Sequence, residues 1–154
     1  MEKEARKPDE TDLRIMRELV RNSNRSYRAL AKGLGMSTTA VIDRIRELER
    51  TGRIIGYGAR FDYLELGYEF MGLVEINISG KRIIEVEQRI AKLPRVAAVW
   101  DTTGEYDSLA VVMCKSRGEL SATVKRMLSI DGVEKTNTNV VLNVVKRLTE
   151  FDGV

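Results

Sequence analysis

The stretch Ser26-Tyr-Arg-Ala-Leu-Ala-Lys-Gly-Leu-Gly-Met-Ser-Thr-Thr-Ala-Val-Ile-Asp-Arg-Ile-Arg46 predicts two short helices that meet at a sharp bend. Ser26 and Ser37 can each cap a helix, because a serine hydroxyl accepts a hydrogen bond from an amide of the first turn. Gly35 lies at the bend, where glycine turns the chain at little steric cost. Val41 and Ile45 are four residues apart and face inward together. This pattern is typical of a helix-turn-helix that binds DNA.

Candidate DNA contacts gather on the outward face of the second helix and near the start of the first. Hydroxyl, carboxylate and guanidinium groups there can reach base edges or phosphates. We expect Arg46 to read a base, and we expect Arg25 and Arg28 to bind phosphates. The predicted DNA-contacting residues are Arg25, Ser26, Arg28, Ser37, Thr38, Thr39, Ile42, Asp43 and Arg46. The alternative is an ordinary hairpin of two helices with no nucleic-acid partner.

Charge is distributed unevenly along the chain. Residues 1–60 contain 14 Lys and Arg against 9 Asp and Glu, a net charge of +5, whereas residues 61–154 have a net charge of −2. A basic segment around the two helices is the electrostatic pattern that duplex DNA attracts. The charge therefore favours DNA over the plain hairpin.

Composition argues against an enzyme and a membrane protein. The 154 residues are 43% hydrophobic and 32% charged, and they include no histidine, the commonest general base and metal ligand. The single cysteine, Cys114, cannot form an intrachain disulfide. No apolar run approaches the roughly 20 residues of a membrane span, and the charged start lacks the apolar segment of a signal peptide. We expect a cytoplasmic regulator, not an enzyme, with no metal and no cofactor.

The pattern changes along the chain from helices alone to strands alternating with helices. A first helix, capped by Asp9 or Thr11 and running to about Asn22, completes a three-helix unit. Residues 54–61 are interrupted by glycine, which indicates either a small wing beside the DNA or a linker strand. We place the DNA-binding domain at residues 1–60, the linker up to about residue 66, and a second domain at residues 67–154.

The second domain follows the order βαββαβ. Period-two alternation predicts strands, period 3.6 predicts helices, and a Ser116 and Glu119 capping box starts the second helix. The expected strands are 71–78, 96–101, 106–115 and 134–145, and the expected helices are 81–93 and the segment from Ser116 to Gly132. This order is that of a ferredoxin-like sandwich, so the predicted fold class is α+β with a winged helix-turn-helix in front.

The strand at 106–115 is apolar on both faces. Leu109, Val111 and Met113 point one way, and the residues between them point the other. Two helices cover only one face of the sheet, so we expect the other face to pack on a second subunit in a homodimer. The alternative is that the chain's own linker covers that face.

Four stretches resemble the Lrp/AsnC family of transcription regulators, and the resemblance covers nearly everything after residue 8. They are Asp12-Leu-Arg-Ile15, Ser37-Thr-Thr-Ala-Val-Ile-Asp-Arg-Ile-Arg-Glu-Leu-Glu-Arg-Thr-Gly-Arg-Ile-Ile-Gly-Tyr57, Thr103-Gly-Glu-Tyr-Asp-Ser-Leu109 and Ile130-Asp-Gly-Val-Glu-Lys-Thr-Asn-Thr138. The resemblance implies a helix-turn-helix that binds double-stranded DNA. It also implies a βαββαβ domain that dimerises, assembles further and binds a small effector, an amino acid, between dimers.

The resemblance implies an effector site at the loop 104–107 and the strand that carries Thr136 and Thr138. A zwitterion needs amides or hydroxyls for its carboxylate and an acidic oxygen for its ammonium. The candidate effector-binding residues are Trp100, Gly104, Tyr106, Asp107, Thr136 and Thr138. In the family the position of Glu105 is more often aspartate, and the alternative role of the loop is a structural turn. Two other functions stay open: a sensing module that docks on a protein partner, and a regulatory subunit of an amino-acid enzyme.

Overall fold

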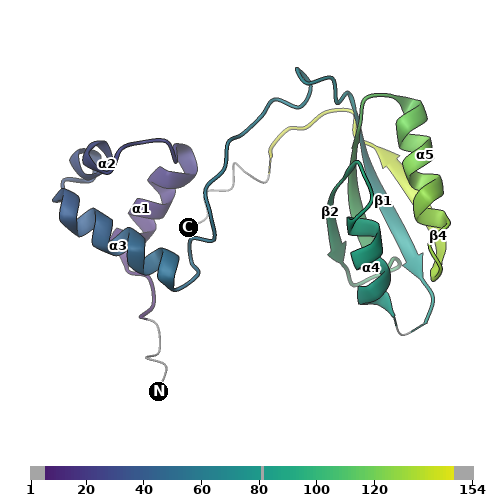
Figure 1. Ribbon diagram of the computed structural model, residues 1–154, viewed down its shortest axis with the longest axis horizontal. Helices are drawn as coiled ribbons and strands as arrows, with labels where there is room; N and C mark the ends of the chain where they lie inside the picture. Colours follow the sequence, from purple (N-terminus) through teal and green to yellow (C-terminus); the bar gives the residue numbers. More distant parts are fainter. Residues whose placement is uncertain (1–5, 81, 148–154) are drawn as a thin grey trace. The chain divides into compact units, whose positions relative to one another are not determined.

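The computed structural model describes residues 6–80 and 82–147, which form two compact units (Figure 1). Among the described residues, one unit consists of residues 6–60 and 145–147, and the other lies within Phe61–Val144. Each unit has its own apolar core, so each can be described by itself.

The N-terminal unit contains three helices, α1 (Glu10–Arg21), α2 (Tyr27–Leu34) and α3 (Thr38–Arg50). Their N-caps are Asp9, Ser26 and Ser37, and each cap side chain accepts a backbone amide of the first turn. The caps predicted at Ser26 and Ser37 are confirmed, and Asp9 rather than Thr11 begins α1. The core residues are Ile15, Leu30, Ala31, Leu34, Val41, Ile45 and Leu48.

The bend between α2 and α3 is built on a left-handed residue. Gly35 has a φ of 68°, and the amide of Met36 donates to the Ala31 carbonyl at 2.9 Å. A side chain at Gly35 would strain this backbone, which explains the glycine there. The predicted helix-turn-helix is confirmed.

The wing expected after α3 does not form. Residues 55–62 contain neither strand nor helix, and the chain passes through them in extended or irregular conformation. Both interpretations of residues 54–61, a wing and a linker strand, are therefore wrong. A strand needs a partner for its amides and carbonyls, and no other segment of the described N-terminal unit is a strand.

The C-terminal unit has the order β1 (Phe70–Ile78), α4 (Ile83–Ala91), β2 (Val96–Asp101), β3 (Ser108–Cys114), α5 (Arg117–Leu128) and β4 (Val133–Val140). All neighbouring strands are antiparallel, in the order β2-β3-β1-β4. The predicted βαββαβ topology is confirmed. The last strand ends at Val140, which pairs with Gly72, so its expected extension to Val145 is wrong. β1 begins only two residues before Gly72, at Phe70, and therefore offers no partner to residues 143–145.

Both helices of this unit cover one face of the sheet. Val86 and Ile90 of α4 and Met127 of α5 pack with the inward residues of β1 and β3. On β3, Ala110, Val112 and Cys114 are fully buried in this core. Leu109, Val111 and Met113 alternate with them and lie on the other face, which we call the open face and which no helix of the described chain covers.

Candidate nucleic-acid interface and effector site

The caps of the helix-turn-helix hold its backbone geometry. The Ser26 hydroxyl accepts from the amide of Ala29, and the Ser37 hydroxyl accepts from the amide of Ala40, each at 3.2 Å. Both serines are exposed at a helix N-terminus, where free amides and the helix dipole favour an anion. The two helix starts are therefore suited to phosphate oxygens.

The outward face of α3 carries polar side chains in its first turns. Thr38, Thr39, Asp43 and Arg46 are exposed, whereas Ile42 is half-buried. The opposite face is anchored in the core. The structure therefore brings the predicted contacts of α3 onto the surface of one helix.

A basic hollow lies between the two helices of the motif. Its volume is about 510 Å³, and it is lined by Ser26, Arg28, Ala29, Ala31, Lys32, Met36 and Thr38. The sequence interpretation omitted Lys32, which lies one turn after Arg28 on α2. The spacing of the two cations, four residues apart, was the signal that places them on one helix face.

Arg25 differs from the other predicted phosphate contacts. Its guanidinium is paired with the carboxylate of Glu18 on α1, and it also lies 3.5 Å from the Ala29 carbonyl. A cation that already has a carboxylate partner has less charge to offer a phosphate. Arg28 and Lys32 are the better candidates.

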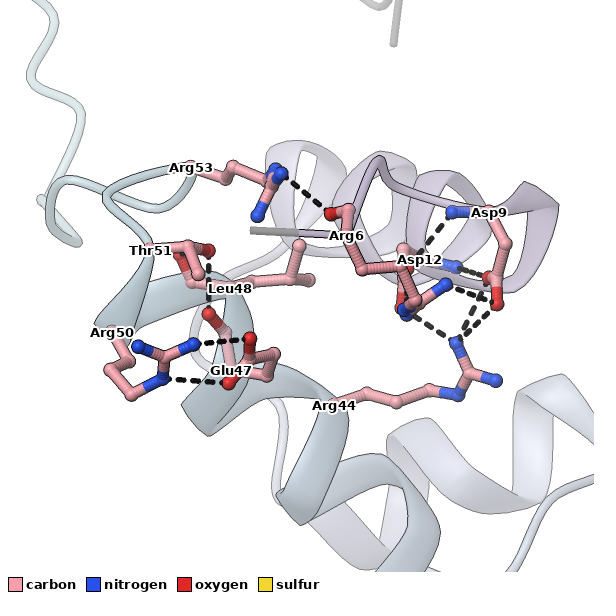
Figure 2. A network of polar contacts seen from close by, with 9 residues as sticks. All are labelled: Arg6, Asp9, Asp12, Arg44, Glu47, Leu48, Arg50, Thr51 and Arg53. Atoms are coloured by element: carbon pink, nitrogen blue, oxygen red, sulfur yellow. Dashed lines mark hydrogen bonds and ion pairs between the residues drawn. The ribbon is translucent and has the colours of Figure 1, made fainter. Parts of the chain in front are cut away.

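Arg44 of α3 is held by the start of α1, as Figure 2 shows. Its Nη1 lies 2.8 Å from Asp9 Oδ2 and 2.7 Å from Asp12 Oδ1. Arg6 binds the same two carboxylates at 2.9 and 2.6 Å. These four residues, which we call the α1–α3 clamp, tie α3 to the N-terminus of α1. Sequence reasoning missed the clamp, because Asp9 and Arg44 are 35 residues apart.

The clamp also sets the protonation of Asp9. The hydrogen bond from Arg44 and then the amide of Asp12 hold the pKa of the Asp9 carboxyl far below its usual range. In return the same carboxylates raise the pKa of Arg44. Asp9 is therefore charged at every pH at which DNA binding would be measured.

The turn between β2 and β3 is the predicted effector loop. The Thr102 amide donates to the Asp107 carbonyl and the Thr102 hydroxyl to the Tyr106 carbonyl, both at 2.9 Å. Asn77 of β1 donates to the Glu105 carbonyl at 2.8 Å. The amides of residues 103–105 donate no hydrogen bond within the described chain, so they are available to an anion.

Asp107 has a structural partner. One of its carboxylate oxygens accepts the amide of Ile78, at the end of β1, at 2.8 Å. This bond joins the loop to the neighbouring strand across 29 positions of sequence. Asp107 therefore anchors the loop to β1.

The six predicted effector residues do not come together. Thr136 pairs with Ile76 and Thr138 with Val74, whose side chains are fully buried beneath the helices. Residues directly opposite each other in a sheet share a face, so both threonines lie on the helix side of the sheet. Trp100 pairs with Leu109 and lies on the open face.

The loop instead borders an open hollow of about 340 Å³. It is lined by Glu75, Thr102, Thr103, Glu105, Tyr106, Ser108 and Leu109. Of the predicted residues only Tyr106 belongs to this lining. Sequence reasoning missed Glu75, although its alternation with Leu73 and Asn77 on β1 was a signal that it lies on the open face.

The described residues offer little for other chemistry. No group of three or more potential metal-ligating side chains occurs among them, and none of their helices is long and apolar enough to cross a membrane. Cys114 is fully buried, and burial raises the pKa of its thiol, so the reactive thiolate is disfavoured.

Comparison with known proteins agrees with this arrangement. A model of the AsnC-type helix-turn-helix domain matches residues 9–49, and a model of the Lrp/AsnC ligand binding domain matches residues 72–151. An uncharacterised HTH-type transcriptional regulator of Pyrococcus abyssi is 44% identical over 138 residues, which is 90% of this chain and 94% of the relative. The HTH-type transcriptional regulator FL11 of Pyrococcus horikoshii is 32% identical over 93% of this chain and 95% of its own length.

A solved structure shares the fold of both units. A transcriptional regulator of Neisseria meningitidis in complex with L-Met has a TM-score of 0.88 and 24% identity, covering 94% of this chain and 96% of that one. The class defined by fold and site is thus a helix-turn-helix regulator with a ligand-binding domain. The chain belongs to the Lrp/AsnC family, and it is a transcription regulator and not an enzyme.

Proposed function

We propose that α2 and α3 bind a specific duplex DNA site through the exposed residues of α3. The exposed face of α3, flanked by a basic hollow and held from behind by the α1–α3 clamp, is the observation that carries this proposal. Arg28 and Lys32 bind phosphates, and Thr38, Thr39 and Arg46 approach base edges. A DNA-binding role is also the reason to place the protein in the cytoplasm.

A gel-shift titration tests the DNA interface. Arg46→Ala costs about 1–3 kcal/mol of binding and relaxes preference at one base, whereas Lys32→Ala weakens binding to all sequences. Lys92→Ala, which removes an exposed lysine from the other unit, is the matched control and leaves the affinity unchanged. If neither Arg46→Ala nor Thr38→Ala with Thr39→Ala alters the shift, this interface is wrong.

The same regulator binds a small effector, an amino acid, in the hollow at the effector loop. The free amides of residues 103–105 and the hydroxyl of Thr103 suit a carboxylate, and Glu75 and Glu105 suit an ammonium. The Neisseria regulator with the same fold binds L-Met, which supports this class of ligand. Trp100, Thr136 and Thr138 do not line this hollow, so the proposed site does not include them.

Calorimetry against each of the twenty amino acids tests the effector site. Glu105→Gln and Thr103→Val weaken binding of the amino acid that binds the wild-type chain, and they leave the DNA affinity without effector unchanged. Glu134→Gln, an exposed carboxylate at the start of β4, is the matched control. The absence of any binding at millimolar concentration contradicts the proposal.

The regulator is a homodimer joined through the open face, and its dimers assemble further. Leu73, Val111 and Met113 form an apolar centre on this face, which would otherwise meet water. Two copies place two α3 helices at two half-sites. Light scattering at micromolar concentration measures the mass directly, and a monomer excludes this assembly.

A further inference from the structure

The charged side chains of α3 fall into two groups. Arg44 is bound by the α1–α3 clamp, and Arg50 is bound by Glu47 at 2.6 Å. Asp43 and Arg46 are exposed, and neither has a hydrogen bond or an ion pair to any residue in the described ranges 6–80 and 82–147. The fold therefore leaves one anion and one cation of this helix unused.

These two side chains lie where the helix can meet the floor of the major groove. They are three residues apart, which places them side by side on one helix face. That face is opposite Val41 and Ile45, which are 0% and 1% exposed. Both residues lie before the last turn of α3 (Thr38–Arg50), and such a helix contacts base edges with residues toward its N-terminus.

A carboxylate on this face needs a donor when DNA arrives, because phosphates repel it and burial removes its water. Cytosine offers its N4 amino group in the major groove, whereas adenine sets the acceptor N7 beside its amino group. A carboxylate therefore favours cytosine. Arginine favours guanine, whose O6 and N7 accept both of its donors.

We propose that Asp43 and Arg46 together read a G·C base pair in each half-site. Arg46 donates to guanine O6 and N7, and Asp43 accepts from the N4 amino group of the cytosine. The amino group and O6 are neighbours in the groove, so an adjacent anion and cation match them. This inference rests on the proposed DNA-binding function of α3.

Binding-site selection from a pool of random duplexes, with the full chain and no added amino acid, tests the pair. The wild-type chain enriches a G·C pair that Asp43→Ala and Arg46→Ala both flatten, at the same position. Loss of the Asp43 contact lowers discrimination there by about 5- to 150-fold. Asp43→Asn weakens the preference for cytosine at this position, because the side-chain amide also pairs with adenine N6 and N7, while Arg46 still favours guanine.

Glu49→Gln is the control for charge alone. It removes one negative charge from the same helix, but from a carboxylate that accepts the Tyr57 hydroxyl at 2.7 Å. Its selected site stays that of the wild-type chain. If Asp43→Ala also leaves the site unchanged, the inference is overturned and the DNA-binding function stands. If the wild-type chain enriches no duplex, the DNA-binding function fails and the inference fails with it.

Discussion

Asp12 is only 2% exposed, and hydrogen-bond donors hold its carboxylate in place. Arg44 and Arg6 bind it from two sides, and the amide of Asp9 donates to it at 3.0 Å. A buried charge is tolerated only when such partners are complete. Asp12, an acid in the first turn of α1, thus also joins α1 to α3 inside the N-terminal unit.

Arg44→Ala lowers the stability of the N-terminal unit by about 1.5–3 kcal/mol, since it removes a charged hydrogen-bond partner from the buried Asp12. Thermal unfolding of the full chain, followed in the transition of the N-terminal unit, measures the loss. Arg50→Ala serves as the control because its partner Glu47 is on the surface, and it changes the midpoint little. Equal midpoints for the two variants would contradict the clamp.

Asp9 makes the same unit sensitive to acid. Its pKa is depressed in the folded state, so the charged form contributes stability above the unfolded pKa, near 4. That contribution is lost as the pH falls below about 4. In unfolding midpoints measured from pH 7 to pH 2, Asp9→Asn starts lower and declines less steeply. A parallel decline in both chains would show that Asp9 does not titrate as described.

At the scale of elements, the turns and helix ends are set by backbone conformation. Gly35 adopts a positive φ between α2 and α3, whereas Gly56 has an ordinary φ in the linker, and a Cβ at either would meet no atom within 4 Å. Space is therefore available at both positions, and only the backbone conformation distinguishes them.

Gly35→Ala destabilises the helix-turn-helix by about 1–2 kcal/mol, because a left-handed residue with a Cβ is strained. Gly56→Ala is neutral or slightly stabilising. Thermal melting of the two variants measures the contrast. A melting point for Gly35→Ala at or above that of the wild-type chain contradicts the strain.

Helix α4 contains a buried carboxyl group whose charged form lowers the stability of the fold. Glu87 of α4 is 8% exposed, and its Oε1 has no hydrogen-bond partner within the described chain. Burial, and then the charges of Asp101 and Asp107, raise its pKa. The folded unit therefore binds this proton more tightly than the unfolded chain, and stability falls as the pH rises through the interval between the two pKa values.

Glu87→Gln stabilises the C-terminal unit at pH 7, and the gain disappears toward pH 4, where the wild-type carboxyl is protonated. Unfolding midpoints at both pH values measure the effect. Glu85→Gln, on the exposed side of α4, is the control and gives no gain. A gain of equal size at both pH values would mean that charge is not the cause.

At the scale of the whole molecule, the proposed dimer depends on the open face. The register pairs Leu73 with Val111 and Met71 with Met113, so these four apolar side chains are neighbours on the open face. All four are only partly buried in the single chain. In the proposed dimer a second copy would remove this surface from water, and burial of apolar surface drives most protein association.

Val111→Lys at the centre of the open face separates the dimer and leaves each unit folded. Ala122→Lys, on the exposed side of α5, is the matched control and stays dimeric. DNA affinity falls with the dimer, because one half-site no longer benefits from the linked second contact. Light scattering and a gel shift on the same samples check both statements. A dimeric Val111→Lys chain would move the interface elsewhere.

The sequence by itself determined the elements and their order. Some features depend only on residues within a few positions of each other, and local spacing is enough to predict them. They are the caps at Ser26 and Ser37, the glycine bend and the alternation along β3. The family's motifs also follow the chain in order. The boundaries of strands were less determined, and β4 ends at Val140 because the length of a strand depends on its partner.

Only the tertiary structure decided which side chains meet. Thr136 and Thr138 are two positions apart, so the sequence places them on one face of β4, but only the pairing with β1 shows that this face is turned toward the helices. Arg44 reaches Asp9 and Asp12 only because α3 packs against α1, and Asp107 reaches Ile78 only across the sheet. The physical reason is that register and packing arise between distant segments, and a shift of one residue moves a side chain to the opposite face.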